Sequence, residues 1–305
     1  MSKNKKQHYV PACYLKAWKD IKCPPNQEPY VWVFDKDGTN ARRKAPSNIF
    51  TETDLYTIHK FDGTRDLSIE KGLSELESNF TKIRTSKFNF HRPLDPHEHA
   101  YLCIFVAAAQ FRTTKSRDHF VKQWGNISSK VEEVKNSKGP YTLDANKIYG
   151  SGKSFKQDEG ALTFDQLKVL AEMPIQMMMP VVLETVTPIL MKMKMAILCT
   201  DDPVGFITLD NPCVWYDPES YKLPPFYRSP GLGKKTIEIT MPISPKQCLL
   251  FSWQDMEGYL EIETEVVDTL NHRHRMLSKT HYIVNTNPIT VNEMWFKSPP
   301  MPDDS

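Results

Sequence analysis

Five polar residues stand beside apolar segments and could together act on an anionic substrate: His8, Gln110, Arg112, Asp210 and Asn211. His8 is the natural acid–base group, because only histidine titrates near neutral pH without help from its surroundings. Asp210 could accept a proton or bind a divalent cation, and Arg112 could hold a phosphate or carboxylate through two parallel hydrogen bonds. Gln110 and Asn211 could orient a ligand or a water molecule. The set suits hydrolysis of a phosphodiester or of another anionic group.

The same residues also have purely structural interpretations. The segment Asp210-Asn211-Pro212 is favourable turn chemistry, because Asx side chains bond the nearby backbone and proline fixes φ. His8 could be a core histidine that ties down the N-terminus. Gln110 and Arg112 could satisfy buried carbonyls or pair with an acid. Convergence of these side chains in space would favour a site, and their dispersal would favour a scaffold.

Other patterns with metal-ligating residues give weaker signals. Glu70 and Glu77 lie two helical turns apart and could hold a cation, although carboxylates at this spacing are more often solvated. His97 and His99 are two residues apart on a predicted helix, so they point to different faces. In the run from His272 to Arg275 the two histidines are also two residues apart, so they too point to different faces of a helix. The chain contains no phosphate-binding loop, dinucleotide fingerprint, HExxH or GxSxG motif.

Composition predicts a globular chain with a full core. The 305 residues are 40% hydrophobic and 25% charged, and the net charge is +2. This length and balance fit a single domain over residues 1–305. The net charge is too small to argue by itself for a nucleic-acid partner. Local basic groups at Arg42-Arg43-Lys44 and at Arg273 and Arg275 keep that partner open.

The cysteines and the apolar segments predict a cytoplasmic protein. None of the six cysteines forms a CxxC pair, and most stand in apolar surroundings, as expected of buried thiols in a reducing compartment. The basic N-terminus is not followed by the apolar core of a signal peptide. The most apolar stretch, residues 175–199, contains Pro180, Glu184 and Lys192, which argues against a membrane span.

The first half of the chain predicts strands followed by helices. Strands are expected at 30–34 and 55–58. The apolar stripe from Ile69 to Ile83 predicts a helix, and Asp95 with Glu98 forms a capping box that starts another. That second helix is apolar nearly all round, so we expect it at the centre of the fold. Residues from about 126 to 160 are polar and predict a flexible insertion.

The second half returns to strands after one more helix. A helix is expected from Thr163, with Pro174, Pro180 and Pro188 each kinking or ending it. A further helix is expected from about Val266 to Leu277. Alternating or apolar runs then predict strands at 191–197, 204–208, 213–216, 237–241, 248–253 and 281–284. The order of elements predicts an α+β fold with a mainly antiparallel sheet and a central helical section.

Four short motifs in this order resemble a bacterial family labelled domain of unknown function 4238. They are His8-Tyr9-Val10-Pro11, Gln110-Phe111-Arg112-Thr113, Thr208-Leu209-Asp210-Asn211-Pro212 and Pro242-Ile243-Ser244-Pro245. Tyr14 and Asn271 also fall where the family tends to carry Tyr and Asn. The agreement in order and rough spacing extends over about residues 5 to 285. The resemblance implies no reaction, because the family has no established activity.

Two departures from the family pattern bear on mechanism. Leu209 stands where relatives usually carry serine, so this chain lacks that hydroxyl. Thr114 stands where proline commonly follows Arg-Thr. A mechanism with a serine nucleophile at this turn is therefore not expected here.

The residues favour a hydrolase that acts on a phosphate-bearing substrate, such as nucleic acid or a nucleotide, with a role in bacterial defence suggested by association alone. His8 would be the acid–base residue, Asp210 a base or ligand of a divalent cation, and Arg112 the anion clamp. The alternative is a non-catalytic module that binds a protein or nucleic-acid partner through its basic groups.

Overall fold

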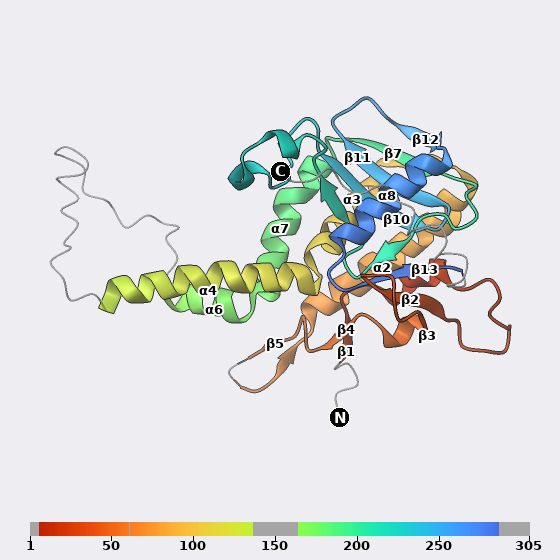
Figure 1. Ribbon diagram of the computed structural model, residues 1–305. Coiled ribbons are helices and arrows are strands. Elements are labelled where there is room, and N and C mark those ends of the chain that lie inside the picture. The colour runs from red at the N-terminus through yellow and green to blue at the C-terminus, as the bar shows by residue number, and fades with distance from the viewer. Residues whose placement is uncertain (1–5, 61, 137–163, 287–305) are drawn as a thin grey trace.

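Helices occupy the middle of the chain, and strands precede and follow them (Figure 1). The computed structural model describes residues 6–60, 62–136 and 164–286. Strand pairing is antiparallel except where β12 (Gly258–Glu261) joins β7 (Lys194–Cys199). The predicted α+β fold with mainly antiparallel sheets and a central helical section is confirmed.

Two sheets form the main β structure. The five-stranded sheet has the order β12-β7-β11-β10-β9, and the four-stranded sheet has the order β3-β2-β13-β8. Two small pairs, β1-β4 and β5-β6, complete the strands. The remaining bounds are β1 (Lys6–His8), β2 (Val31–Asp35), β3 (Arg42–Lys44), β4 (Thr51–Thr53), β5 (Ile58–His59), β6 (Arg65–Asp66), β8 (Thr208–Leu209), β9 (Val214–Tyr216), β10 (Glu238–Ser244), β11 (Gln247–Ser252) and β13 (His281–Val284).

The helices α2 (Ser68–Ser86) and α3 (Pro96–Phe111) form where the sequence predicts them. The stripe on α2 is buried, and α3 starts with the predicted capping box between Asp95 and Glu98. The Phe80 and Phe105 rings stack with their centres 4.0 Å apart, which joins α2 to α3 inside the core. The largely buried α3 is central, as expected.

The N-terminal motif leads into a short helical segment that is anchored in the core. Helix α1 (Ala12–Leu15) and the 3₁₀ turn η1 (Lys16–Trp18) bury Tyr14, Leu15 and Trp18 completely. The other 3₁₀ turns are η2 (Pro46–Asn48), η3 (Phe88–Phe90), η4 (Ser220–Lys222) and η5 (Pro225–Tyr227). Helix α8 (Thr264–Leu277) lies between the last two strands of the chain.

Prolines interrupt the helical segment once rather than three times. Helix α6 (Phe164–Glu172) ends before Pro174, and the axis turns by 93° into α7 (Pro174–Leu190). Pro180 and Pro188 remain inside α7, so neither of these two prolines ends the helix. The buried residues of α7, among them Met179, Val182 and Val186, offset the lost hydrogen bonds.

The predicted insertion begins inside a helix. Helix α4 (Thr114–Asn136) includes residues 126–136, and the rest of the predicted insertion lies outside the described residues. Figure 1 shows α4 extending away from the sheets with α6 alongside it. Among the described residues, no single helix has the length and apolar character to cross a membrane, and α6 and α7 meet that criterion only as a bent pair.

Candidate functional site

Strand β1 places His8 where three parts of the chain meet. His8 pairs with Thr51 of β4, so the start of the chain is held against residues 51–53. Its backbone carbonyl accepts hydrogen bonds from Arg112 Nη2 at 2.6 Å and from the Tyr56 hydroxyl at 3.2 Å. The first motif and the Arg112 motif therefore meet through main chain rather than through the imidazole.

Arg112 ends α3 and is only 3% exposed. Besides the His8 carbonyl, its Nη1 donates to Glu77 Oε1 at 2.9 Å, and its Nε donates to the Tyr56 hydroxyl at 3.4 Å. Burial lowers the pKa of Arg112, but the neighbouring Tyr56 and Glu77 outweigh burial and raise that pKa above its ordinary value. A guanidinium with these partners fixes the shape of the site instead of offering free donors to an anion.

A polar cavity of about 100 Å³ lies beside these contacts. We call it the His8 pocket, and it is lined by Gln7, His8, Tyr56, Glu70, Leu73, Ser74, Glu77 and Arg112. Glu70 accepts a hydrogen bond from the Gln7 side chain, and burial raises the pKa of Glu70. Two carboxylates that lie two turns apart on α2 thus share one cavity with a histidine and an arginine.

The His8 imidazole has one nitrogen without a partner. Its Nε2 is buried and makes no hydrogen bond with the residues that the structure describes. Burial lowers the pKa of His8, and this outweighs the Pro46 carbonyl and the Glu77 charge, which act in the opposite direction. His8 is therefore neutral at pH 7 and can accept a proton. An unpartnered buried nitrogen costs about 1–3 kcal/mol, so a water molecule or ligand at this position would stabilise the site.

Asp210 and Asn211 are bonded to a different loop. Asp210 accepts hydrogen bonds from the backbone N–H groups of Lys279, Thr280 and His281 at 2.6–3.0 Å, and from the Thr280 hydroxyl at 2.7 Å. Asn211 donates to the carbonyl of Leu277 and accepts from Lys279 N. Neither residue lines the His8 pocket. These contacts favour the structural interpretation of the turn.

Gln110 stands two residues before Arg112 and is not among the residues that line the His8 pocket. Its backbone carbonyl accepts a hydrogen bond from the Ser116 hydroxyl at 2.7 Å, which helps join α3 to α4. Of the five residues chosen from sequence, the structure therefore brings together His8 and Arg112. Gln110, Asp210 and Asn211 lie outside that pocket.

We expect Asp210→Ala to lower the free energy of unfolding by about 3 kcal/mol, because it leaves several N–H groups of the loop without an acceptor. Urea denaturation followed by tryptophan fluorescence measures this change. Asp210→Asn keeps one acceptor oxygen and should lose less. A variant that is fully stable but catalytically dead would instead support the chemical role predicted for Asp210.

The motif residues form a hydrogen-bonded network around the start of the chain. The Tyr14 hydroxyl donates to the Pro242 carbonyl at 2.6 Å and lies 2.7 Å from the Thr208 hydroxyl oxygen. Asn271 accepts from Ile207 N at 3.0 Å and donates to the Gly205 carbonyl at 2.8 Å. Most of the polar atoms in the motifs are thus used to hold backbone segments that are distant in sequence.

Sequence reasoning undervalued Glu70 and Glu77 and missed Gln7 and Tyr56. The seven-residue spacing indicated that the two glutamates lie near each other on α2. Whether they are solvated or buried depends on which other elements pack against that helix. Strand β1 and Arg112 cover this face, so Glu77 is paired with Arg112 and Glu70 with Gln7. Gln7 is 1% exposed although it stands in a polar terminal sequence, so burial here follows from tertiary packing alone.

One group in the described part of the chain brings three metal-ligating side chains together. His91, Cys199 and Glu261 each offer a ligand atom, and these atoms lie within 4.8 Å of one another. The group shares no residue with the His8 pocket. It was not predicted, because its members are far apart in sequence and form no spaced motif.

One comparison with known proteins confirms the family that the sequence resembles. The model of the family described as "Protein of unknown function (DUF4238)" matches residues 6–287 of the chain. No curated protein and no solved structure matches the chain. The match extends over almost all of the described residues, from β1 through β13, so it covers the His8 pocket and the surrounding network.

Proposed function

Because this chain belongs to the DUF4238 family, whose description names no activity, we propose a function from its geometry: a metal-assisted, His8-dependent hydrolase of a phosphate-bearing substrate. The observation that carries the proposal is the buried, unpartnered Nε2 of His8 beside a polar cavity that contains two carboxylates. Groups of this kind in one cavity are typical of hydrolytic sites.

His8 is the general base in this proposal. Its lowered pKa keeps the imidazole neutral at pH 7, so Nε2 can take a proton from an attacking water molecule. The charge of Glu77 raises the pKa of His8 and would stabilise the imidazolium that forms, whereas the charge of Arg112 acts in the opposite direction. Asp210, for which a base role was predicted, is left out because hydrogen bonds already occupy both of its carboxylate oxygens.

A divalent cation is the cofactor that this charge arrangement favours. When both carboxylates are ionised, Glu70 and Glu77 outweigh the single charge of Arg112, so a phosphate group alone would be repelled. Carboxylate oxygens are ligands of Mg²⁺ and Mn²⁺, and a cation between them would reverse the sign of the local charge. Glu70 and Glu77 would hold such a cation, whose positive charge would supply polarisation of the phosphate, and His8 would take the proton from the attacking water.

The size of the cavity limits what can enter. About 100 Å³ accommodates a phosphate group with little space beyond it, so the remainder of a nucleotide or nucleic acid would lie outside the His8 pocket. Arg112 would shape the pocket rather than clamp the anion as predicted, because each of its nitrogens already has a partner. We therefore expect activity on small phosphate esters as well as on larger substrates.

The test is hydrolysis of bis(4-nitrophenyl) phosphate and 4-nitrophenyl phosphate with Mg²⁺ or Mn²⁺ by the full chain. We expect His8→Ala to lower kcat/KM by about 100-fold or more, because general-base catalysis contributes that much. The variant keeps the backbone carbonyl that Arg112 and Tyr56 bind, so it should fold. We expect Glu70→Gln to raise the metal concentration needed for half-maximal rate.

Matched controls are available on neighbouring surfaces. His97→Ala removes an exposed histidine, and Glu75→Gln removes an exposed carboxylate of α2, both outside the His8 pocket. Neither should change the rate. Hydrolysis that persists in His8→Ala at the wild-type rate, or no hydrolysis of either ester with either metal, would rule the proposal out.

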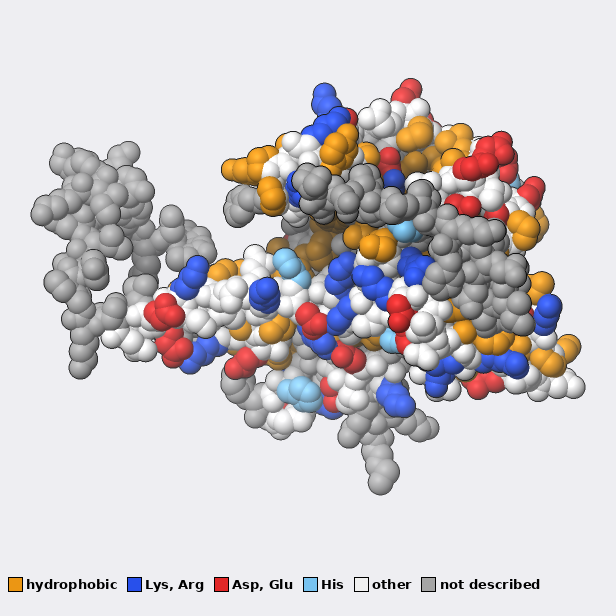
Figure 2. All heavy atoms as spheres, in the orientation of Figure 1, with side chains coloured by type: hydrophobic (Ala, Val, Ile, Leu, Met, Phe, Trp, Pro, Cys, Tyr) orange, Lys and Arg blue, Asp and Glu red, His pale blue; other side chains and the backbone are white. Residues whose placement is uncertain are grey.

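A non-catalytic binding module is the alternative, and a basic surface supports it. Figure 2 shows Lys and Arg side chains gathered near the middle of the visible face. At the end of α8, Lys115 and Lys36 donate to the carbonyls of Leu277 and Ser278, and Lys279 contacts α4. Binding of nucleic acid at this surface should weaken steeply as salt rises, whereas salt-independent binding would point to a protein partner.

Except for Lys44, which is exposed, the basic groups that the sequence suggested for such binding already have partners within the chain. They are Arg42 with Asp35, Arg43 over the Trp32 ring, Arg273 with Glu238, and Arg275 with the carbonyl of Lys36. Internal pairing reduces the charge that these side chains can offer to an anion. The binding alternative therefore has less support than the hydrolase.

The cellular setting belongs to the same proposal. All six cysteines are free thiols, and four of them are buried, which supports a reducing bacterial cytoplasm. A role in defence follows only from the kind of substrate proposed, since enzymes that degrade nucleic acids or nucleotides often act in that context.

A further inference from the structure

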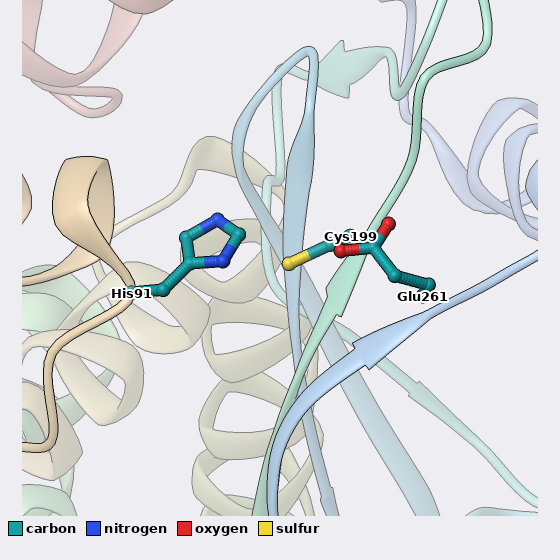
Figure 3. Close-up of side chains that lie close together, drawn as sticks. All are labelled: His91, Cys199 and Glu261. Carbon is teal, nitrogen blue, oxygen red and sulfur yellow. The ribbon is translucent and has the colours of Figure 1, made fainter.

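His91, Cys199 and Glu261 come from three separate elements and converge at one edge of the five-stranded sheet. His91 follows η3, Cys199 is the last residue of β7, and Glu261 is the last residue of β12. Figure 3 shows the His91 ring facing the Cys199 sulfur, with the Glu261 carboxylate close to that sulfur. All three ligand atoms lie within 4.8 Å of one another.

The strand register explains why two of them meet. The parallel pairing of β12 with β7 sets Glu261 directly beside Cys199, and Ile262 N donates to the Cys199 carbonyl at 2.9 Å. Directly paired residues of neighbouring strands project to the same face of the sheet. The sulfur and the carboxylate are therefore held together by backbone hydrogen bonds and not by a chance side-chain conformation.

A second contact holds His91 in place. Its ring stacks on that of Tyr259, with the centres 4.6 Å apart and the planes 10° from parallel. The Tyr259 hydroxyl in turn donates to the carbonyl of Arg92 at 2.9 Å. The His91 backbone is left-handed, with a φ of 51°, which is uncommon for a residue other than glycine. The imidazole thus stands against the sheet despite its position in a connecting turn.

We propose that His91, Cys199 and Glu261 form a zinc-binding site. Imidazole, thiolate and carboxylate are the ligand types that zinc takes in proteins, and three protein ligands leave a fourth position for an exchangeable ligand. A thiolate is a poor ligand for Mg²⁺ or Ca²⁺, so this site differs in chemistry from the cation proposed in the His8 pocket. With one thiolate, one carboxylate and a neutral imidazole, the charge of Zn²⁺ is balanced.

The geometry requires a small adjustment that the exposed ligands can make. Zn–N, Zn–O and Zn–S bonds of about 2.0–2.3 Å place tetrahedral ligand atoms closer together than 4.8 Å, by roughly 1 Å. Cys199 is 3% exposed and fixed in β7, whereas His91 and Glu261 are exposed at the surface. Closure would therefore involve their side chains and leave the sheet unchanged.

A cavity of about 480 Å³ adjoins the site and indicates what the fourth ligand would be. His91 lines this cavity together with Met195, Ile197 and Tyr259, and its volume is in the range of small-molecule sites. Met195, Ile197 and Cys199 are every second residue of β7, so their side chains lie on the same face of the sheet. The cavity suits a ligand with an apolar body and one atom that binds the metal, such as a carboxylate or thiol.

Cobalt substitution tests the site without an assay of activity. The full chain is stripped with a chelator and titrated with Co²⁺, which gives a near-ultraviolet charge-transfer band when a thiolate binds it. We expect one equivalent of Co²⁺ to produce this band and Zn²⁺ to displace it. We expect His91→Ala and Glu261→Gln to weaken Co²⁺ binding at least tenfold, and Cys199→Ala to abolish the charge-transfer band.

Controls separate this proposal from loss of folding and from the hydrolase. His91 and Glu261 are exposed, so their variants should fold even if Cys199→Ala does not. Cys23→Ser and His97→Ala change a thiol and an imidazole outside the group and should bind like the wild type. His8→Ala should also keep the full band, whatever its effect on hydrolysis. A wild-type chain without the band, or ligand variants that bind Co²⁺ as tightly as the controls, would overturn the zinc site.

Discussion

Gly205→Ala is expected to lower the free energy of unfolding by roughly 4 kcal/mol or more, and to reduce the soluble yield of the chain. Gly205 has a φ of +67°, in the left-handed region where a side chain costs about 1–2 kcal/mol. A Cβ atom there would lie 1.9 Å from the carbonyl oxygen of Pro245 and 2.8 Å from its carbonyl carbon. Both are backbone atoms, so no side chain can move aside.

The clash would break contacts that join the Gly205-Phe206 segment to Pro245 and to Asn271. Phe206 N donates to the Pro245 carbonyl at 2.7 Å, and the Gly205 carbonyl accepts from Asn271 at 2.8 Å. Moving Pro245 away from a new methyl group would lengthen the first bond, and moving Gly205 would lengthen the second. The substitution therefore combines steric overlap with the loss of buried hydrogen bonds.

Two other glycines separate the steric effect from the backbone effect. Gly258 also has a positive φ, +80°, but a Cβ atom there meets nothing within 4 Å, so Gly258→Ala should cost only the conformational term. Gly233 has open space and no positive φ, so Gly233→Ala should be nearly neutral. Urea denaturation of the three variants, supported by soluble yield, gives the comparison. Equal stability of the Gly205 and Gly258 variants would contradict the close contact with Pro245.

The polar residues of the four motifs, together with Tyr14 and Asn271, are better explained as residues that connect distant segments than as a set of catalytic residues. Arg112 binds the His8 carbonyl, Tyr14 binds that of Pro242, and Asn271 binds that of Gly205. In each case a polar side chain donates to a backbone carbonyl of a distant segment, and burial of that carbonyl without a partner would be costly. The His8 imidazole is the exception, because its Nε2 has no partner among the described residues. This difference is why the proposed chemistry rests on His8.

Local patterns predicted α2 and α3, whereas α4, the longest helix of the described residues, was not predicted, and part of it was expected to be a flexible insertion. The stripe of α2 and the capping box of α3 are local patterns, and local patterns depend on neighbours three or four residues away. Strand β12 was missed because it is short, at four residues, and none of them is fully buried. It forms by pairing with β7, some sixty residues earlier in the chain, so no local signal marks it.

The candidate sites depend on which strand residues are paired and on which elements pack over each side chain. The sequence shows neither. Asp210 and Glu70 are both acidic residues in polar surroundings, yet Asp210 is occupied by backbone N–H groups and Glu70 lines a cavity. Cys199 looked like an ordinary buried thiol, and only its pairing with Glu261 gives it a ligand as a neighbour. Residue type predicts what a group can do, and tertiary packing decides whether the group is available.

His274 is expected to make the protein sensitive to acid. This residue of α8 is fully buried, with Nε2 2.8 Å from the Thr240 hydroxyl oxygen and Nδ1 without a partner among the described residues. Burial, helped by the charge of Arg273, lowers the pKa of His274 from 6.5 to about 3. The folded protein thus keeps His274 neutral at a pH where the unfolded chain already binds a proton.

The direction of the effect follows from this difference in proton binding. Because the pKa is lower in the folded state, the contribution to stability is complete above pH 6.5 and is lost as pH falls from 6.5 towards 3. Each pH unit within this window costs about 1.4 kcal/mol, so His274 alone should remove about 3 kcal/mol between pH 6.5 and pH 4.5. That is a large share of the stability of a typical domain.

The contribution of His274 can be isolated from that of the carboxyl groups by a variant that does not titrate. His274→Gln keeps a polar group near Thr240 but cannot take up the proton, so it should be less stable than wild type at pH 7.5 and lose less on acidification. The quantity to measure is the difference in unfolding free energy between the two proteins at pH 7.5, 6.0 and 4.5. If this difference stays constant with pH, His274 is not the titrating group, and acid sensitivity must come from other groups.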